Sequence, residues 1–360
     1  MADARRLTQG VQYHGSETSK ERALFGRLST FAGGWTLEAS EAVTSSEGVA
    51  EGEVLNPLSG LVEKSLVVAE GIGQSGSVRY RLLEPVRQYA REKLEEVRRR
   101  HAEFFLAQAA EAEPGLRGPE DRKWLERLER EHDNMRAALS WALEREEVEL
   151  GLMPAGALGT FWHAHGHLGE GRRWLEEALA KDGRASVAAR IKALKALFWS
   201  VCDQWDNDRV EAVAKEGMEL SAEVEIGSSL AASLRTMLAV PAWVGGDYER
   251  GKDLLEESLA FSQETDDKIM IAEALVQLGG TTAAMGDIAR ANEIFEEGIA
   301  VCREAGYTNR LPFFLHSLGY MLMLEGDYER GAALNEEAVT ICREHGYKAS
   351  LNYALTVVCC

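Results

Sequence analysis

One stretch of the sequence, WVGGDYERGKDLLEE, has the composition of a phosphate-binding loop. Gly246, Gly251 and Lys252 stand at the G-x-x-x-x-G-K spacing at which backbone N–H groups and a lysine hold phosphate oxygens. A working loop also uses a Ser or Thr after the lysine to bind magnesium, but Asp253 follows it here and Asp247 lies inside the loop. A triphosphate would meet carboxylates, so we expect neither a nucleotide nor another cofactor at this site.

The same stretch recurs along the chain. GDYERGKDLLEESLAFSQE begins at Gly246, GDIARANEIFEEGIAVCRE at Gly286 and GDYERGAALNEEAVTICRE at Gly326, a period of 40 residues. GHLGEGRRWLEEALA at Gly166 keeps this register, and WDNDRVEAVAKEGMEL at Trp205 fits after a one-residue slip. Five units at a fixed period predict a solenoid, because each unit buries its apolar face only by stacking on its neighbours.

Each unit is predicted to be a pair of helices joined at Gly-Asp. The aspartates Asp247, Asp287 and Asp327 suit a helix N-cap, where a carboxylate accepts from free backbone N–H groups. The glycine before each one suits the end of the preceding helix, where a positive φ is needed. The first helices of the pairs are expected over Ala188–Cys202, Ser228–Val244, Ile269–Met285 and Leu311–Glu325. The units resemble tetratricopeptide repeats of unusual length.

The sequence HAHGH offers three imidazoles to a metal. His163 and His167 are four residues apart, with His165 between them, and this spacing can chelate zinc on a helix. Gly166 is expected to end that helix and turn one imidazole away, and no Cys or carboxylate nearby completes a tetrahedral set. No metal site is predicted.

The stretch EREHDNMRAAL brings Glu131, His132 and Asp133 together, which suggests acid–base chemistry. Adjacent residues on a helix point in different directions, so these three do not converge on one substrate atom. We interpret them as surface and capping groups. No Ser-His-Asp or Cys-His arrangement stands out on a strand-turn scaffold, so enzymatic activity is not predicted.

Three tryptophans fall on the first helices of the units, the layer that usually lines the concave side of a solenoid. They are Trp162, Trp199 and Trp243. Large aromatic side chains are more often core than site, but an exposed one on a concave face can anchor a partner. They are the candidates for a partner-binding groove.

The first hundred residues predict a winged helix. Amphipathic helices are expected within ERALFGRLSTFAGGWTLEASEAV, EVLNPLSGLVEKSLVVAE and SVRYRLLEPVRQYAREKL. Leu66–Ala69 and Val78–Leu82 read as a hairpin around the turn GIGQSG. Val54–Lys64 would be the reading helix on DNA, but it carries Glu63 and a single basic residue, which disfavours DNA binding by this chain alone.

Several stretches in order resemble one known family. LFGRLSTFAGGWTLEASEAV, LVEKSLVV, YRLLEPVRQYARE, RRRHAEFFLAQAAEAEPGLRGPE and WLERLEREHDNMRAALSWALE are similar to the middle section of bacterial STAND-type signal-transduction ATPases, the regulators related to AfsR, LuxR and MalT. The resemblance covers nearly all of residues 20–345.

This resemblance implies a nucleotide-binding domain, then a winged helix that packs on it, then a helical array that senses an inducer or partner. Nothing before residue 20 is long enough to hold such an ATPase domain. Many relatives have a Met-His-Asp triplet that touches the nucleotide, whereas Leu82, Leu83 and Glu84 stand here. The chain therefore departs from the family at its nucleotide contacts.

We expect four segments: an extended or disordered tail over 1–19, a winged helix over 20–98, linking helices over 99–150 and the repeat array over 151–360. The array stops at KASLNYALTVVCC, the first helix of a sixth unit without a second helix to cover it. Such an open apolar helix favours self-association, with Cys359 and Cys360 as exposed thiols.

Composition limits the partners. The chain has 360 residues, 45% of them hydrophobic, and a net charge of −19 that lies in residues 101–360, so that part repels phosphate backbones. No apolar stretch reaches the ~20 residues of a membrane helix, and no signal sequence opens the chain. We expect a cytoplasmic protein with no membrane partner and five cysteines that form no disulfide scaffold.

The predicted fold is mainly α: a winged helix followed by a right-handed α-solenoid of tetratricopeptide-like helix pairs. The predicted function is a non-enzymatic sensor and protein-interaction module of a STAND-type transcriptional regulator. It would bind a protein, peptide or small-molecule inducer on the concave repeat surface, with a nucleotide-binding domain packing on residues 20–98. The alternatives are a free-standing scaffold for protein–protein interaction and, less favoured, a winged-helix DNA-binding protein.

Overall fold

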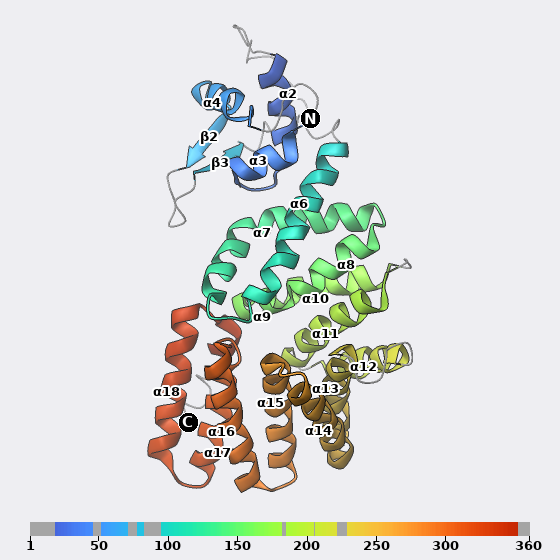
Figure 1. Ribbon diagram of the computed structural model, residues 1–360, viewed down its shortest axis with the longest axis vertical. Helices are drawn as coiled ribbons and strands as arrows, with labels where there is room; N and C mark the ends of the chain where they lie inside the picture. Colours follow the sequence, from blue (N-terminus) through green and yellow to red (C-terminus); the bar gives the residue numbers. More distant parts are fainter. Residues whose placement is uncertain are drawn as a thin grey trace. The chain divides into compact units, whose positions relative to one another are not determined.

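The computed structural model describes residues 19–45, 52–70, 78–82, 95–181, 185–204, 206–221 and 229–351. These residues form a mainly helical chain of two compact units (Figure 1). The winged-helix unit comprises Met1–Gln108 and Glu129–Arg145, and the repeat unit comprises Ala109–Leu128 and Glu146–Cys360. Residues 1–18 of the predicted tail lie outside the described residues.

The winged-helix unit contains a small antiparallel sheet with strand order β1-β3-β2. Its strands are β1 (Trp35–Thr36), β2 (Val67–Glu70) and β3 (Arg79–Leu82), and its helices before the hairpin are α2 (Ser19–Leu28), α3 (Leu37–Thr44) and α4 (Leu55–Glu63). The predicted hairpin is confirmed, with Val67 paired to Leu82. The third predicted helix of this region falls on residues 83–94, outside the described part of the chain.

The first predicted helix is in fact two helices with β1 between them, which corrects the sequence analysis. Gly33 and Gly34 follow α2 and are poor helix formers. Thr36 then begins α3 as its N-cap, because its hydroxyl accepts from the backbone N–H of Ala39 at 3.2 Å. Trp35 pairs with Tyr80 and adds a third strand to the hairpin.

Two long helices belong to both units: α6 (Glu95–Gly115) and α7 (Asp121–Glu144). The first part of α6, up to Gln108, and the last part of α7, from Glu129, belong to the winged-helix unit. There the ring of Phe105 contacts Phe31 edge-on, and Phe31 stacks on Trp35. The tip between them, Ala109–Leu128, belongs to the repeat unit. The linking helices that we expected over 99–150 are therefore shared between the units.

The repeat unit stacks helix pairs. Its helices are α8 (Val148–Ala157), α9 (Gly159–His165), α10 (Leu168–Leu179), α11 (Val187–Asp203), α12 (Asn207–Ser221), α13 (Ser229–Val244), α14 (Tyr248–Glu264), α15 (Lys268–Ala284), α16 (Ile288–Ala305), α17 (Leu311–Leu324) and α18 (Tyr328–His345). The predicted α-solenoid is confirmed (Figure 1). In the first pair the leading helix is interrupted, so α8 and α9 together precede α10.

The Gly-Asp junctions are as predicted. Gly246, Gly286 and Gly326 have φ values of 81°, 90° and 91°. The aspartate after each one caps the next helix, as Asp287 does by accepting from the backbone N–H of Arg290 at 3.1 Å. Neighbouring helices approach closely where a glycine faces an aromatic ring; a Cβ on Gly171 would lie 2.6 Å from the indole of Trp162. The junctions and these contacts position the inner helices.

The two ends of the repeat unit are joined by hydrogen bonds. The carboxylate of Asp121, at the start of α7, accepts from Thr308 at 2.7 Å and from the hydroxyl of Tyr347, and it pairs with His345 at 2.8 Å. Asp121 and Tyr347 are both 1% exposed. The last repeats are thus fastened to the tip that precedes the first.

Candidate functional site

The phosphate-loop lookalike lies on a helix junction. Lys252 is in the first turns of α14 and pairs with Glu256 one turn later, at 3.8 Å. Asp247 caps the same helix by accepting from Arg250 N–H at 3.3 Å. The strand-loop-helix context of a phosphate site is therefore replaced here by a turn between two helices.

The HAHGH histidines separate into different environments. Gly166 ends α9 with a φ of 77°, as predicted, and His167 comes after it, before α10. His163 pairs with Asp203 of α11 through Nδ1 at 2.7 Å. The Nδ1 atom of His163 is thus already paired with a carboxylate of the next repeat.

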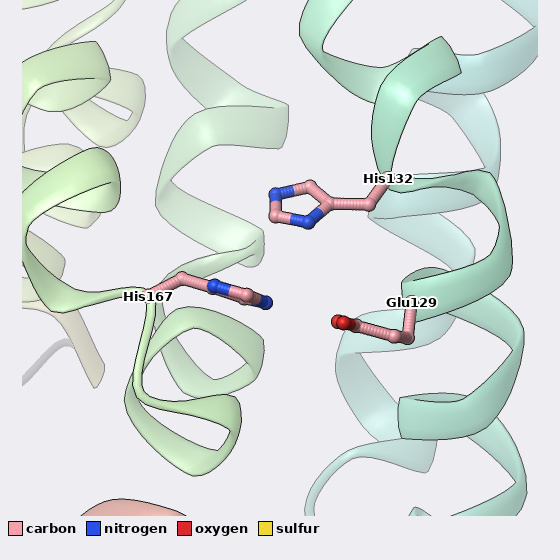
Figure 2. Close-up of side chains that lie close together, drawn as sticks. All are labelled: Glu129, His132 and His167. Carbon is pink, nitrogen blue, oxygen red and sulfur yellow. The ribbon is translucent and has the colours of Figure 1, made fainter. Parts of the chain in front are cut away.

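Glu129 and His132 lie one turn apart on the same side of α7 (Figure 2). Glu129 is exposed and His132 is buried. A structural zinc site is normally four-coordinate, and α7 supplies two side chains here. The spacing alone does not make a metal centre.

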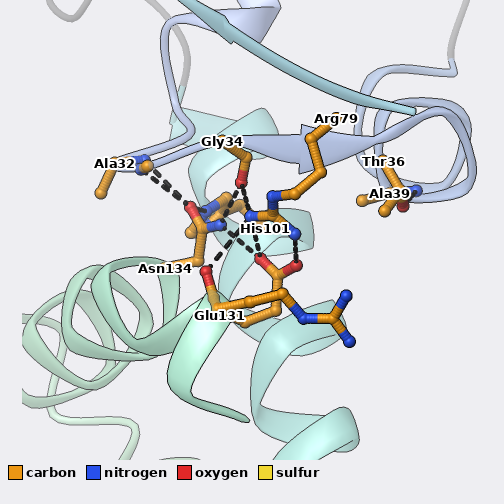
Figure 3. A network of polar contacts seen from close by, with 10 residues as sticks. Ala32, Gly34, Thr36, Ala39, Arg79, His101, Glu131 and Asn134 are labelled. Carbon is orange, nitrogen blue, oxygen red and sulfur yellow. Dashed lines mark hydrogen bonds and ion pairs between the residues drawn. The ribbon is translucent and has the colours of Figure 1, made fainter. Parts of the chain in front are cut away.

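The surface interpretation of the EREHDN stretch is wrong for Glu131 and His132, which are 7% and 6% exposed. Glu131 forms a buried ion pair with Arg79 of β3, and Arg79 also donates to the carbonyl of Gly34 at 2.7 Å (Figure 3). Only Asp133 is at the surface, where it pairs with Arg136 at 2.9 Å. Strand β3 is therefore attached to α7 by a charged pair rather than by apolar contact alone.

Asn134, 1% exposed, completes this network (Figure 3). Its Nδ2 donates to Gly34 O and to Glu131 Oε2, both at 2.9 Å. Its Oδ1 accepts from Ala32 N at 3.0 Å and lies 3.3 Å from Nε2 of His101. One asparagine thus satisfies the irregular backbone before β1, which explains why a polar residue is buried here. We name this set, Arg79, Glu131 and Asn134, the winged-helix network.

The candidate reading helix α4 offers little to DNA. Its flank holds one basic side chain, Lys64, and that ammonium donates to both carboxylate oxygens of Glu21, at 3.0 and 2.9 Å. Glu63 beside it is exposed. The charges on this helix do not favour binding to a phosphate backbone.

The three candidate tryptophans do not share one surface. Trp162 is 1% exposed and packs against Gly171. Trp243 is 41% exposed on α13. Trp199 lines a cavity of about 100 Å³ within the repeat unit.

This cavity, the repeat pocket, is formed where separate repeats converge. Its lining includes Thr160 and His163 of α9, a stripe of α11, Glu273 of α15 and Arg310 before α17. Arg117, from the tip between α6 and α7, also lines it. The α11 stripe is Lys192, Lys195, Ala196, Trp199, Ser200 and Asp203, residues three to four apart that share one face of the helix.

A buried ion pair supports one wall of the pocket. Glu273, 5% exposed, accepts from Arg310 through both carboxylate oxygens, at 3.1 and 2.7 Å, and from the hydroxyl of Tyr307 at 2.7 Å. Burial by itself would raise the pKa of Glu273, but the Arg310 guanidinium outweighs it and holds the pKa at about 2. Arg310 also lies over the ring of Trp199, 5.3 Å from its centroid.

Most charged groups of the pocket have partners of opposite charge. Lys192 and Arg117 share the carboxylate of Glu113, and Arg310 has Glu273. Lys195 differs, because its ammonium donates only to the thioether sulfur of Met270, at 3.8 Å, among the described residues. Burial lowers the pKa of Lys195 to about 8, although the nearby Glu273 favours the charged form.

Trp199 is also incompletely satisfied. Its indole Nε1 is buried and has no hydrogen-bond partner in the part of the chain that the structure describes. Such groups are uncommon in native proteins, and a bound molecule is one ordinary explanation for them. Lys195 and Trp199 stand four residues apart on the same face of α11.

The sequence analysis missed Lys195, Glu273, Arg310 and Arg117. One signal was available: Glu273 is the single carboxylate in the apolar helix KIMIAEALVQLGGTTAA, where a buried charge needs a partner. The partner itself could not be identified, because Arg310 is 37 residues away and follows a loop.

Comparison with known proteins agrees with this architecture. Residues 18–95 match the family described as "Winged helix-turn-helix domain", and residues 237–325 and 320–360 match the family described as "Anaphase-promoting complex subunit 5". A protein of Mycobacterium tuberculosis named "Putative HTH-type transcriptional regulator" is 33% identical over 283 residues, 74% of this chain. The chain is similar in sequence to these regulators. It spans 31% of the length of that relative.

Two solved structures are similar to this chain in fold. A STAND protein with a tetratricopeptide repeat sensor from Pyrococcus horikoshii superposes with a TM-score of 0.51, at 16% identity, over 97% of this chain and 55% of that chain. A Rap protein in complex with Competence and Sporulation Factor superposes with a TM-score of 0.50, at 14% identity, over 70% of this chain and 80% of that one. The fold of a winged helix followed by tetratricopeptide-like repeats, which the resemblance to STAND-type regulators implied, is confirmed.

Among the described residues of this chain, no helix is long and apolar enough to span a bilayer. The predicted C-terminal helix begins at Lys348. Most of it, including Cys359 and Cys360, falls on residues 352–360, outside the described part of the chain. Self-association through that helix stays a prediction.

Proposed function

We propose that this chain is the non-enzymatic sensor and coupling section of a transcriptional regulator, and that the repeat pocket is its ligand site. One observation carries the proposal: side chains from three separate repeats and from the α6–α7 tip meet around one cavity, and the cavity contains an ammonium that has no anionic partner in the described part of the chain. A ligand there would contact all these elements at once. Its binding would favour one arrangement of the repeats over others.

Relatives support a sensor role. The similar STAND structure is described as having a tetratricopeptide repeat sensor, and the similar Rap protein is described in complex with Competence and Sporulation Factor. We transfer to this chain only the class of function, binding of an inducer or partner by helical repeats. A nucleotide-binding domain of the longer protein would pack on residues 20–98.

The helices α6 and α7 supply a route for coupling. Arg117, in their tip, lines the repeat pocket, and Glu131 and Asn134, further along α7, hold β3 and the residues before β1. The segment from Arg117 into α7 thus connects a residue of the pocket with the residues of the winged-helix network along the chain. A ligand that fixes Arg117 would bias α7, to an extent limited by its different affinities for the two states.

The test is a thermal-shift screen of metabolites and peptides, with the Thr160→Trp variant as control. Thr160 lines the pocket, so an indole there fills the space that a ligand needs. We expect some compound to raise the melting temperature of the wild-type chain and not that of Thr160→Trp, because only ligands of the native state stabilise it. Circular dichroism verifies that the variant is folded.

A free-standing scaffold is the competing function. It predicts that every ligand found acts equally on the intact chain and on an Arg117→Ala variant, with no change in hydrogen exchange in β3 and α7. A sensor predicts that ligand binding changes exchange in those two elements. Ligands that bind outside the pocket and leave β3 unaltered would refute the sensor proposal.

A further inference from the structure

We propose that the repeat pocket takes a small ligand with a compact anionic group, a carboxylate or a phosphate, that pairs with the Lys195 ammonium. This inference rests on the proposed function of the pocket as a ligand site. It goes further because it assigns the chemical class of the ligand and the residue that selects it.

Charge pairing within the pocket leads to Lys195. Arg310 is neutralised by Glu273, and Lys192 and Arg117 both contact Glu113. Within the ranges that the structure describes, the Lys195 ammonium donates to the Met270 sulfur alone, which is a weak acceptor. A buried charge normally has an ionic partner, and an anion from outside the chain would supply it.

Local charge separates this pocket from the rest of the chain. Four basic side chains, Arg117, Lys192, Lys195 and Arg310, line it against two acidic ones, Asp203 and Glu273, in a protein of net charge −19. Cations gathered in a concave site with low-dielectric walls attract anions there. The lining also includes Thr160 and Asn309, which offer a hydroxyl and an amide.

The size of the cavity limits the ligand. About 100 Å³ is room for several waters, since one water needs roughly 10–15 Å³ by this measure, and it is well below the roughly 300–1,000 Å³ of drug-sized sites. A carboxylate or phosphate group fits this space. Trp199 forms the adjoining wall, and its buried N–H lacks an acceptor among the described residues, which a ligand oxygen would provide.

The probes are inorganic phosphate, acetate and trialanine, with acetamide and the C-terminal amide of trialanine as neutral counterparts. Melting temperatures are measured at pH 7 for the full chain, for Lys195→Met and for Lys252→Met. Lys252 is a matched control because it is a lysine on a helix of the same array, paired with Glu256 at the surface. Met is unbranched like lysine, keeps most of the length of its side chain and removes its charge.

We expect at least one anionic probe to raise the melting temperature of the wild-type chain and of Lys252→Met by about 2–4 °C. Lys195→Met should show no shift, and neither neutral counterpart should act on any variant. Phosphate or acetate acting alone would identify a free small anion as the source, and trialanine acting alone would identify the end of a peptide.

A pH series separates ligand pairing from a structural role of Lys195. The shift caused by the anion should be present at pH 7 and lost by pH 9.5, because the pKa of Lys195 is about 8 and the neutral amine does not attract an anion. A merely structural lysine would not make the ligand-induced shift depend on pH in this way.

Equal shifts in wild type and Lys195→Met, equal shifts from neutral and anionic probes, or no shift from any anion would each overturn the anion inference. These results leave the proposed function standing if a neutral compound from the wider screen stabilises the wild-type chain and not Thr160→Trp. If no compound of any charge binds in a way that Thr160→Trp blocks, the proposed function fails as well.

Discussion

The winged-helix network and the charged groups of the repeat pocket differ in how completely their polar groups are satisfied. In the winged-helix network, the Arg79 guanidinium, the Glu131 carboxylate and both ends of the Asn134 amide all have partners within the unit. In the repeat pocket, Glu273 and Arg310 are equally well paired, but Lys195 has no anionic partner and the Trp199 N–H no acceptor among the residues described. A closed network holds elements together, whereas a cluster with groups left over next to a cavity has the means to bind something.

The largest expected effect sharpens the structural half of this comparison. Glu273→Gln removes the countercharge of the partly buried Arg310, so we expect the repeat unit to lose about 3–5 kcal/mol of stability in urea denaturation. Glu304→Gln, which removes an exposed partner of Lys268, should cost less than about 1 kcal/mol. A loss below that of the control would show that the pair contributes nothing.

The same pair predicts an acid dependence. The folded pKa of Glu273 is about 2, below the usual value of 4.5, so its contribution is full above about pH 4.5 and is lost as the pH falls through 2. Acid titration of the wild-type chain should therefore show a loss of helical circular dichroism in this window that is reduced in Glu273→Gln.

The next effect concerns the winged-helix network. Asn134→Ala removes an amide that accepts from the backbone of Ala32 and donates to that of Gly34, at a cost of about 1–3 kcal/mol, although the Gly34 carbonyl keeps Arg79 as a donor. Hydrogen exchange at β1 and β3 should accelerate accordingly. Asp133→Ala, one residue earlier on the exposed face, is the matched control and should leave that exchange unchanged.

A smaller effect of opposite sign tests the pocket. Lys195→Met removes a half-buried cation that lacks an anionic partner among the described residues, so we expect the variant to be more stable than the wild type at pH 7, by about 1–3 kcal/mol. Because the folded pKa is lowered, the penalty is full below about pH 8 and disappears as the pH rises towards 10.5. A variant less stable than the wild type at pH 7 would mean that Lys195 is satisfied without a ligand.

The smallest effect is spectroscopic. Trp199→Phe should change stability by less than about 1 kcal/mol, since its indole N–H has no partner to lose. It should however remove the change in tryptophan fluorescence that a pocket ligand produces. Trp243→Phe, on the exposed side of α13, should keep that change. Retention of the signal in Trp199→Phe would place the ligand elsewhere.

The repeat architecture could be predicted from the sequence, because a local signal repeats: Gly246-Asp247 and its copies carry both the positive φ and the cap within two residues. Strand β1 could not, because two residues give no periodicity and Trp35 is a strand only through its pairing with Tyr80. The burial of Asn134 could not be predicted either, because it too depends on distant partners. Its partners are about a hundred residues away.

The candidate site was predictable only in part. All three tryptophans were predicted to line the concave side of the solenoid. Trp199 does line the repeat pocket, but Trp162 on the preceding repeat lies in the core and Trp243 on the next repeat is exposed. Helical periodicity gives the face of a residue and not the neighbour that covers it. The charges of the pocket depend on the α16–α17 loop and on the α6–α7 tip, whose positions are set by tertiary packing.

The hydrogen bonds that Asp121 accepts from Thr308 and Tyr347 have a consequence for unfolding. An ordinary solenoid behaves as a line of nearest neighbours and can fray from either end. Here the Asp121 carboxylate is bonded to Tyr347, 226 positions further along the chain. Neither of the two segments that this bond joins is therefore free to fray independently. Melting of one terminal repeat must then break the bonds that secure the other, which makes denaturation of the array concerted.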